Sequence, residues 1–445
     1  MQPRPSKARG SAASSSQRVA LLVTAGLLVL APAASADTFV VNDRGDQAPG
    51  SCSPSDCTLR EAAIAATELN GDDKVKLPST KPYRLTRSSN LAGPEEEDGD
   101  LDVGTMLAVG NGLRVVHPGD GRAKINLGQA EDRAFEAIGI LRLNKVNIRG
   151  GAANSSGEAG GAIHMTGSLV LRRSKLSKNN APDVGGAIFV DQGILDAKRS
   201  QFVRNEAGQG GAAFVDDAAS MSLTRTTVHR NEASSDAGGV WLRHAASTSS
   251  LTESTISENT SGGDGGGLFT EADVLSITNS TIASNSADGR GGGIYGAPDS
   301  ETRMNAVTVA RNRADADDTA GPDSGGGLFA DGGSDVFETR NSLVAKNRTT
   351  GDLINECRAP APVGVESLGG NLITSNDDCP FFDHATDLLT ANPGIGALAS
   401  NGGPTKTIGL EAGSSAIGQA DGPNPPQRDQ RGVLRQNPDI GAYER

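Results

Sequence analysis

The middle of the chain repeats one pattern of apolar and polar positions. Each unit opens with glycines and a short apolar segment, and it closes on an asparagine. The units begin at residues 160, 185, 210, 238, 265, 291 and 325, so successive starts are 25, 25, 28, 27, 26 and 34 residues apart. A period of this size is typical of a solenoid, in which each repeat forms one coil against its neighbours.

Inside each unit, apolar and polar residues alternate before the closing asparagine, which predicts strands buried on one face. A third short strand should follow the glycines, as in 187–190, where either Ile188 or Phe189 could face inward. Three short strands per coil predict a parallel β-helix with coils about 4.8 Å apart. The rival solenoid, a leucine-rich repeat, is disfavoured because its leucine spacing is absent. The position three residues before the asparagine is always apolar: Leu176, Phe202, Val228, Ile256, Ile282, Val309 and Val344.

The closing asparagines recur at one corner of the predicted coil. Stacked amides at such a corner can donate to one another and satisfy the polar groups of the turn. We therefore predict a structural asparagine ladder. Its members are Asn179, Asn205, Asn231, Asn259, Asn285, Asn312 and Asn347.

The segment before the repeats predicts a capping helix. In TLRE, 58–61, Thr58 and Glu61 have the spacing of a capping box. Leu59, Ala63, Ala66 and Leu69 follow at helical spacing, and Asn70-Gly71 should end the helix. A short amphipathic helix can close the open end of a solenoid.

The first 36 residues have the features of a secretory signal peptide. Basic residues precede an apolar run at 19–31, and Ala34-Ser35-Ala36 precedes Asp37. A membrane anchor is the alternative, but the run is shorter than the roughly 20 residues that span a bilayer. We expect cleavage after Ala36, export from a bacterial cell, and a mature chain without an integral membrane segment.

Composition fits a repetitive exported protein. Aromatic residues make up 3% of the chain and glycines number 58, which favours an aliphatic stacked core with many tight turns. Cleavage would remove four of 41 basic residues and none of the 54 acidic ones, leaving 37 against 54 and a formal charge of −17. This balance disfavours nucleic acid as a partner.

The four cysteines form one close pair near each end, Cys52 with Cys57 and Cys357 with Cys379. In an exported chain this arrangement predicts two disulfides. Zinc ligation is the alternative, but clustered histidines are lacking, and we predict no resident metal.

Several stretches resemble known families. CTLREAAIAATELNGDD at 57–73 resembles the CSLREA region of secreted bacterial proteins, with Thr58 in place of the usual serine. NPGIGALASNGGPTKTIGL at 392–410 and DIGAYE at 439–444 resemble the choice-of-anchor Q module, and the GGAI and FVRN phrases are similar to repeats of chlamydial polymorphic membrane proteins.

The resemblance implies a secreted or surface-displayed right-handed parallel β-helix of pectin-lyase-like type, and it supplies no catalytic residues. It divides the chain into a signal peptide at 1–36, an N-terminal cap at 37–99, coils at 100–357 and a C-terminal module at 358–445. Because no anchoring tail or outer-membrane barrel follows, we expect release or non-covalent retention. Separately, we expect a monomer.

Charged residues recur in register and are the candidate binding residues. A column before the asparagines and a second column near it could form a basic stripe that binds acidic polysaccharide. The first column contains Lys178, Arg204, Arg230, Arg311 and Lys346 and is interrupted by Glu258 and Ser284, and the second contains Arg173, Arg199 and Arg225. An acidic column of Asp191, Asp216, Glu271 and Asp331 could neutralise the stripe or hold Ca²⁺, although its spacing matches no EF-hand loop.

Two functional hypotheses follow. The first is a non-catalytic binding or structural role, such as glycan recognition or adhesion at the cell surface. The alternative is a polysaccharide lyase or glycoside hydrolase of pectate-lyase-like fold, which could use Arg173, Arg199 or Asp216. The phrase DSGGG at 323–327 resembles a serine nucleophile motif but coincides with the start of a repeat.

Overall fold

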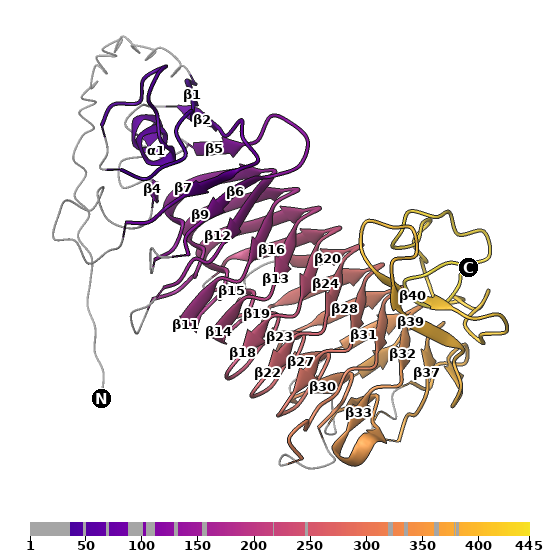
Figure 1. Cartoon of the computed structure of the whole chain (residues 1–445). Helices are drawn as coiled ribbons and strands as arrows, with labels where there is room; N and C mark the ends of the chain where they lie inside the picture. Colours follow the sequence, from indigo (N-terminus) through magenta and orange to yellow (C-terminus); the bar gives the residue numbers. More distant parts are fainter. Residues whose placement is uncertain are drawn as a thin grey trace, which may run out of the picture. The chain divides into compact units, whose positions relative to one another are not determined.

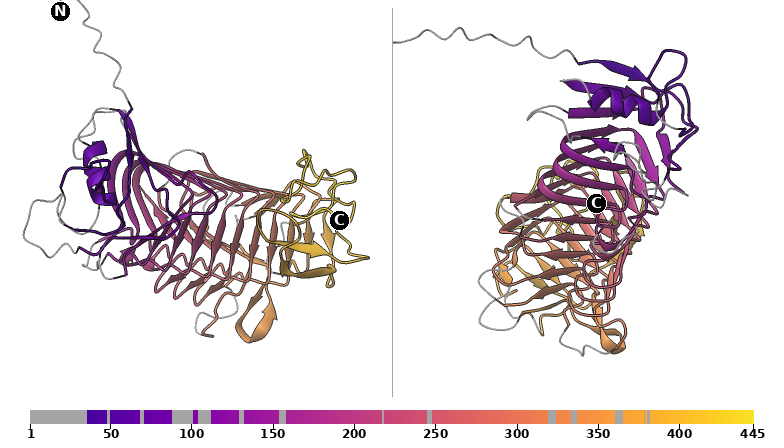
Figure 2. Two further views of the ribbon diagram at one scale, coloured as in Figure 1. Left: turned by 45° about the horizontal axis from the view of Figure 1, so that its top comes forward. Right: turned by 90° about the vertical axis from the view of Figure 1, so that its left-hand side faces the viewer.

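The computed structural model describes residues 36–47, 50–67, 71–87, 101–103, 112–128, 132–153, 158–216, 218–244, 248–318, 324–332, 337–359, 365–377, 379 and 382–445. The predicted signal peptide, apart from Ala36, lies outside these residues. Within residues 36–445 the chain winds into successive coils whose strands align in rows (Figures 1 and 2). Nearly all strand pairings between coils are parallel, as the period of the repeats predicts.

Three sheets, named A, B and C here, form the sides of the coils. Sheet A receives one long strand or two short strands from each coil. Its strands are β1 (Thr38–Val40), β2 (Asp72–Lys76), β4 (Leu101–Val103), β5 (Gly112–Val116), β7 (Phe135–Asn144), β9 (Ile163–Arg172), β12 (Ile188–Lys198), β15 (Ala213–Val215), β16 (Ser220–Thr224), β19 (Val240–Leu242), β20 (Thr248–Thr252), β23 (Leu268–Thr270), β24 (Val274–Thr278), β27 (Ile294–Gly296), β28 (Thr302–Asn305), β30 (Leu328–Ala330), β31 (Phe337–Arg340), β35 (Cys357–Arg358) and β36 (Val365–Ser367).

Sheets B and C are built from shorter strands. Sheet B contains β3 (Pro82–Arg84), β6 (Ala123–Asn126), β8 (Val146–Arg149), β10 (Lys175–Ser177), β13 (Gln201–Val203), β17 (Thr227–His229), β21 (Thr255–Ser257), β25 (Thr281–Ala283), β29 (Thr308–Ala310), β32 (Leu343–Ala345), β37 (Leu372–Ile373) and β38 (Leu388–Leu389). Sheet C contains β11 (Asn180–Val184), β14 (Glu206–Gln209), β18 (Glu232–Ala233), β22 (Thr260–Ser261) and β26 (Ser286–Ala287).

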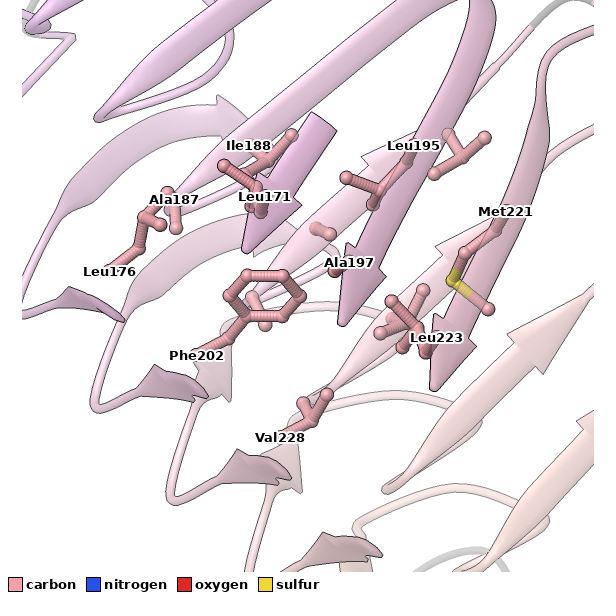
Figure 3. Close-up of a cluster of buried hydrophobic side chains, with 14 of the residues drawn as sticks. Leu171, Leu176, Ala187, Ile188, Leu195, Ala197, Phe202, Met221, Leu223 and Val228 are labelled. Atoms are coloured by element: carbon pink, nitrogen blue, oxygen red, sulfur yellow. The ribbon is translucent and has the colours of Figure 1, made fainter. Parts of the chain in front are cut away.

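Apolar side chains from all coils fill the interior. Leu171, Leu176 and Phe202 are fully buried, and they point toward the same space between the sheets (Figure 3). Ile188 belongs to this core, whereas Phe189 packs in a separate cluster outside it. Ile188, and not Phe189, therefore faces the interior, because adjacent strand residues face opposite sides of a sheet.

The glycines stand where another side chain would collide with the next coil. Gly185 has a φ of 68°, in the left-handed region, and a Cβ on Gly186 would lie 2.3 Å from the carbonyl oxygen of Gly211. Both observations agree with the turn role predicted for these positions.

The asparagine ladder is confirmed. The side chain of Asn205 accepts hydrogen bonds from the backbone and side-chain amides of Asn179 and donates to Asn231, at 2.9 Å for each side-chain pair. The same pattern continues to Asn347, which donates at 2.6 Å to the buried carboxylate of Glu356.

The capping helix is α1 (Leu59–Thr67), and both bonds of the predicted capping box form between Thr58 and Glu61. The parallel pairing extends beyond the predicted coil range at both ends, from β1–β2 before residue 100 to β37–β38 after residue 357. Both predicted disulfides form, Cys52 with Cys57 and Cys357 with Cys379. Among the described residues, no helix is long and apolar enough to cross a membrane.

The end of the chain folds along the side of the coils. Strands β39 (Ile395–Ala399) and β40 (Thr407–Leu410) pair antiparallel, and loops follow to Arg445. Residues 395–445 are the part of the predicted module at 358–445 that packs along the coils, and from here on we call this part the C-terminal module. Its apolar residues Ile395, Ile408 and Ile440 pack with outward-facing alanines of sheet B, among them Ala283 and Ala310. A smaller antiparallel pair, β33 (Arg348–Thr349) and β34 (Leu353–Ile354), flanks the single turn η2 (Thr350–Asp352).

Candidate functional site: a basic face on sheet B

All eight predicted cations lie at two corners that flank sheet B. Arg173, Arg199 and Arg225 occupy the corner between sheets A and B, with φ between 51° and 53°. The second corner, between sheets B and C, holds five more cations, also in the left-handed region. They are Lys178, Arg204, Arg230, Arg311 and Lys346, with φ of 56°, 56°, 54°, 58° and 59°.

The buried ladder residues follow these cations directly. Asn179 and Asn205 come after Lys178 and Arg204, while Ser174 comes after Arg173, so each cation stands beside an inward-facing residue. Serine and threonine residues at the corner between sheets A and B form a second ladder, which we did not predict from the sequence. In this ladder the Thr226 amide donates to Ser254 Oγ at 3.0 Å.

The strands between the two corners add further cations. Lys124, Asn147 and Lys175 are in register across β6, β8 and β10, and the neighbouring outward column includes Arg149. We define the basic face as residues 122–127, 145–149, 173–178, 199–204 and 225–230. These segments contain eleven lysines and arginines and no acidic residue.

The cations of the basic face are close enough to affect one another. Burial lowers the pKa of Lys175, and the positive charges of Arg122, Arg204 and Arg149 lower it further. The Arg122 side chain extends across the neighbouring coil, and its Nε donates to the carbonyl oxygen of Arg173 at 2.6 Å. This concentration of like charge favours an anionic partner.

Within the described part of the chain, ion pairs neutralise the basic face only at its border. Arg225 pairs with Glu253, and Arg230 pairs with Glu258 at 2.7 Å, so acidic residues of the following coil occupy the same two corners. Glu258 itself has a φ of 52°, which shows that this corner accepts an acidic side chain.

Beyond that border the C-terminal module covers sheet B. The side chain of Gln430 is buried, with its Nε2 2.9 Å from Thr255 Oγ1 and its Oε1 2.6 Å from Thr281 Oγ1. The Arg311 guanidinium donates to the carbonyl oxygens of Gly396 and Ile395 in the module. Arg311 therefore does not belong to the open basic face, and the predicted stripe is interrupted.

Lys346 is also separated from the open face. Its backbone amide donates to Glu356 at 2.7 Å, and its side chain is partly buried beside the last coils. The six predicted cations from Arg173 to Arg230 are the ones that the fold brings together.

The acidic column lies on the side of sheet A and does not neutralise the stripe. Asp216 directly follows β15 and bonds to Arg243 Nε at 2.7 Å, while Asp331 accepts from the Tyr295 hydroxyl at 2.5 Å. Asp191 follows Val190, which pairs with Val215, and Glu271 lies 3.6 Å from His244. Nowhere among the described residues do three acidic, histidine or cysteine side chains gather as a metal site would require.

The residues suggested for catalysis do not converge. Arg199 follows the last residue of β12, whereas Asp216 follows Val215, which pairs with Val190 near the beginning of that strand. Within DSGGG, Asp323 lies outside the described residues, and Ser324 is buried at 1% exposure where its repeat begins.

Sheet A also bears an aromatic stack that we did not predict from the sequence. Its ring centroids are 4.4 to 5.9 Å apart, within the range of favourable ring contacts. In the sequence, most repeats have an aromatic residue four positions after their first glycine, and this recurrence could have predicted the stack. The stack contains His164, Phe189, Phe214, Trp241, Phe269, Tyr295 and Phe329.

Comparison with known proteins supports the fold. Residues 186–361 match the family model for a right handed beta helix region. With the three parallel sheets, this match defines the fold as a right-handed parallel β-helix. Among solved structures, the crystal structure of pectate lyase Pel9A is similar, at 15% identity and a TM-score of 0.47, with 93% of this chain and 98% of that chain covered. No curated protein matches the chain.

Proposed function

We propose that the protein is a secreted or surface-exposed β-helix that binds acidic polysaccharide without cleaving it. The observation that carries this proposal is the basic face, in which eleven cations and no acidic residue occupy adjacent segments of an acidic chain. Neighbouring coils lie about 4.8 Å apart, so cations recur along the face at a distance comparable to one sugar unit of a chain. Successive carboxylates of a polyuronate can then meet successive cations.

Export and surface exposure rest on the N-terminal sequence, the two disulfides and the resemblance of 57–73 and 392–410 to secreted bacterial proteins. Disulfides persist mainly outside the reducing cytosol. Detection of the protein in the culture medium or on intact cells would test this part of the proposal.

Charge reversal at the centre of the basic face tests polysaccharide binding. Lys175→Glu combined with Arg204→Glu should weaken binding to polygalacturonate by about tenfold, because two attractive contacts become repulsive. Both positions should tolerate the change, since Lys175 is an outward strand residue and Glu258 occupies the corner equivalent to Arg204.

The matched control reverses two cations beside sheet C. Arg313→Glu with Arg348→Glu changes the net charge equally, in a pair of bridged residues away from sheet B. Equal losses in both double variants would contradict the proposal. Release of reducing ends from polygalacturonate by the unaltered protein would instead support the alternative of a lyase or hydrolase.

A further inference from the structure

A cavity of about 470 Å³ opens beside the first rings of the aromatic stack. This volume is within the range of pockets that hold small molecules. Phe189 lines the cavity and is partly exposed, whereas Phe214, next in the stack, is fully buried. The cavity lies on the side of sheets A and C, and it shares no residue with the basic face.

The charges around the cavity are opposite in sign to those of the basic face. Four carboxylates line it, those of Glu136, Glu158, Asp183 and Asp216. Two guanidiniums offset them in part: Arg133 pairs with Glu136 and lies 3.8 Å from Glu158, and Arg243 pairs with Asp216.

The fourth carboxylate that lines the cavity belongs to Asp183. Its side chain is exposed on β11, and it forms no ion pair with any residue in the described part of the chain. His164 does not compensate for this charge, because burial lowers its pKa, although nearby Glu136 opposes that shift. Near neutral pH the cavity therefore has an excess of negative charge and attracts a cation.

A partly exposed aromatic ring beside polar and charged walls suits a carbohydrate. The C–H groups of a sugar can pack against the part of Phe189 that lines the cavity, while its hydroxyl groups bond to the paired carboxylates and guanidiniums. We propose that this cavity binds an amine-bearing sugar residue of the hexosamine class, with the ammonium group at Asp183 and the ring against Phe189. The site is independent of polyanion binding by the basic face.

The single tryptophan gives a direct readout. Trp241 is the only tryptophan of the chain, and its ring lies 5.3 Å from that of Phe214, which lines the cavity. We expect a saturable change of tryptophan fluorescence with glucosamine, a roughly two- to fivefold weaker response with glucose, and no response with galacturonate at the same concentrations.

Two variants separate the roles of ring and carboxylate. Phe189→Ala should weaken binding of both glucosamine and glucose by roughly three- to tenfold. Asp183→Asn should remove the preference for glucosamine over glucose while leaving glucose binding unchanged. The control Asp273→Asn, an exposed aspartate beyond β23, should retain the preference.

Three results would overturn the proposal. They are an undiminished preference for glucosamine in Asp183→Asn, binding of galacturonate as strong as that of glucosamine, or the absence of a saturable response to any of the three sugars.

Discussion

Asn231 shows how one buried side chain joins three coils. Its amide group donates to the Phe202 carbonyl oxygen in the preceding coil and to Asn259 Oδ1 in the following one, while its own oxygen accepts from Asn205. The sequence predicted this role because equivalent residues recur at a fixed place. It left Ile188 and Phe189 undecided because both are apolar, and the structure places them on opposite sides of sheet A.

Asn231→Ala should therefore be strongly destabilising. Donors in Asn205 and an acceptor in Phe202 would lose buried partners, and we expect a loss of roughly 3 kcal/mol in the free energy of unfolding. Urea denaturation measures this loss. Glu232→Ala, at an exposed adjacent position, should change the stability by less than about 0.5 kcal/mol, and similar effects of both substitutions would contradict the ladder's energetic role.

Glu356 should make stability depend on pH. Burial raises its pKa to about 7 from the ordinary 4.5, despite hydrogen bonds from Thr374, Asn347 and Lys346 that oppose the shift. Because the folded state favours the protonated carboxyl, its contribution to stability is greatest below about pH 4.5 and is lost as the pH rises through about 7.

Glu356→Gln should remove that dependence. Relative to this variant, the unaltered protein should lose on the order of 3 kcal/mol between pH 4.5 and 8. Thermal unfolding at several pH values measures the difference. Glu366→Gln, an exposed carboxyl on β36, serves as the control, and a parallel pH profile for Glu356→Gln and the unaltered protein would refute the assignment.

Among the elements, sheet B has two different environments. Its outward positions are mainly charged or polar from Lys124 to His229, with Val203 as an exception, and they are mainly small from Ser257 to Ala345, with Leu343 as an exception. The change from polar to small residues is visible in the sequence. Only the position of the C-terminal module shows that the small residues are covered. Strand periodicity could not predict that placement, because the module's contacts join residues far apart in the chain, such as Thr281 and Gln430.

Gln430→Ala should loosen the C-terminal module without unwinding the coils. The substitution leaves Thr281 and Thr255 without their buried partner, so the module should be cleaved faster by a protease while far-ultraviolet circular dichroism stays unchanged. Gln427→Ala, at an exposed position of the same module, should leave the cleavage rate unchanged. Equal rates for both variants would show that Gln430 does not hold the module in place.

At the scale of the whole molecule, the charge is segregated. The chain has a formal net charge of −13, yet the basic face contains eleven cations. The sequence predicted charged columns in register, but it could not show which of them share an open surface. Arg311 and Arg230 have equivalent sequence positions, and only the folded chain reveals that the module covers Arg311.

Salt should therefore weaken polysaccharide binding. Attraction by an exposed basic face is screened over about 10 Å at 0.1 M salt, so affinity for polygalacturonate should fall steeply between about 0.05 and 0.5 M NaCl. Binding at several salt concentrations tests this expectation. The Lys175→Glu, Arg204→Glu variant should show a shallower dependence, and an affinity independent of salt would rule out an electrostatic interface.

Because the corner residues have a left-handed backbone, substitutions there that raise the melting temperature would lower the affinity for an anionic ligand. Arginine and lysine adopt this conformation at a cost of roughly 1–2 kcal/mol, which glycine avoids and asparagine often reduces. Engineering the corners of the open face for heat resistance, for example with Arg204→Gly, would relieve backbone strain and discard a cation in the same step. A variant selected only for a higher melting temperature should therefore bind polyanions with lower affinity.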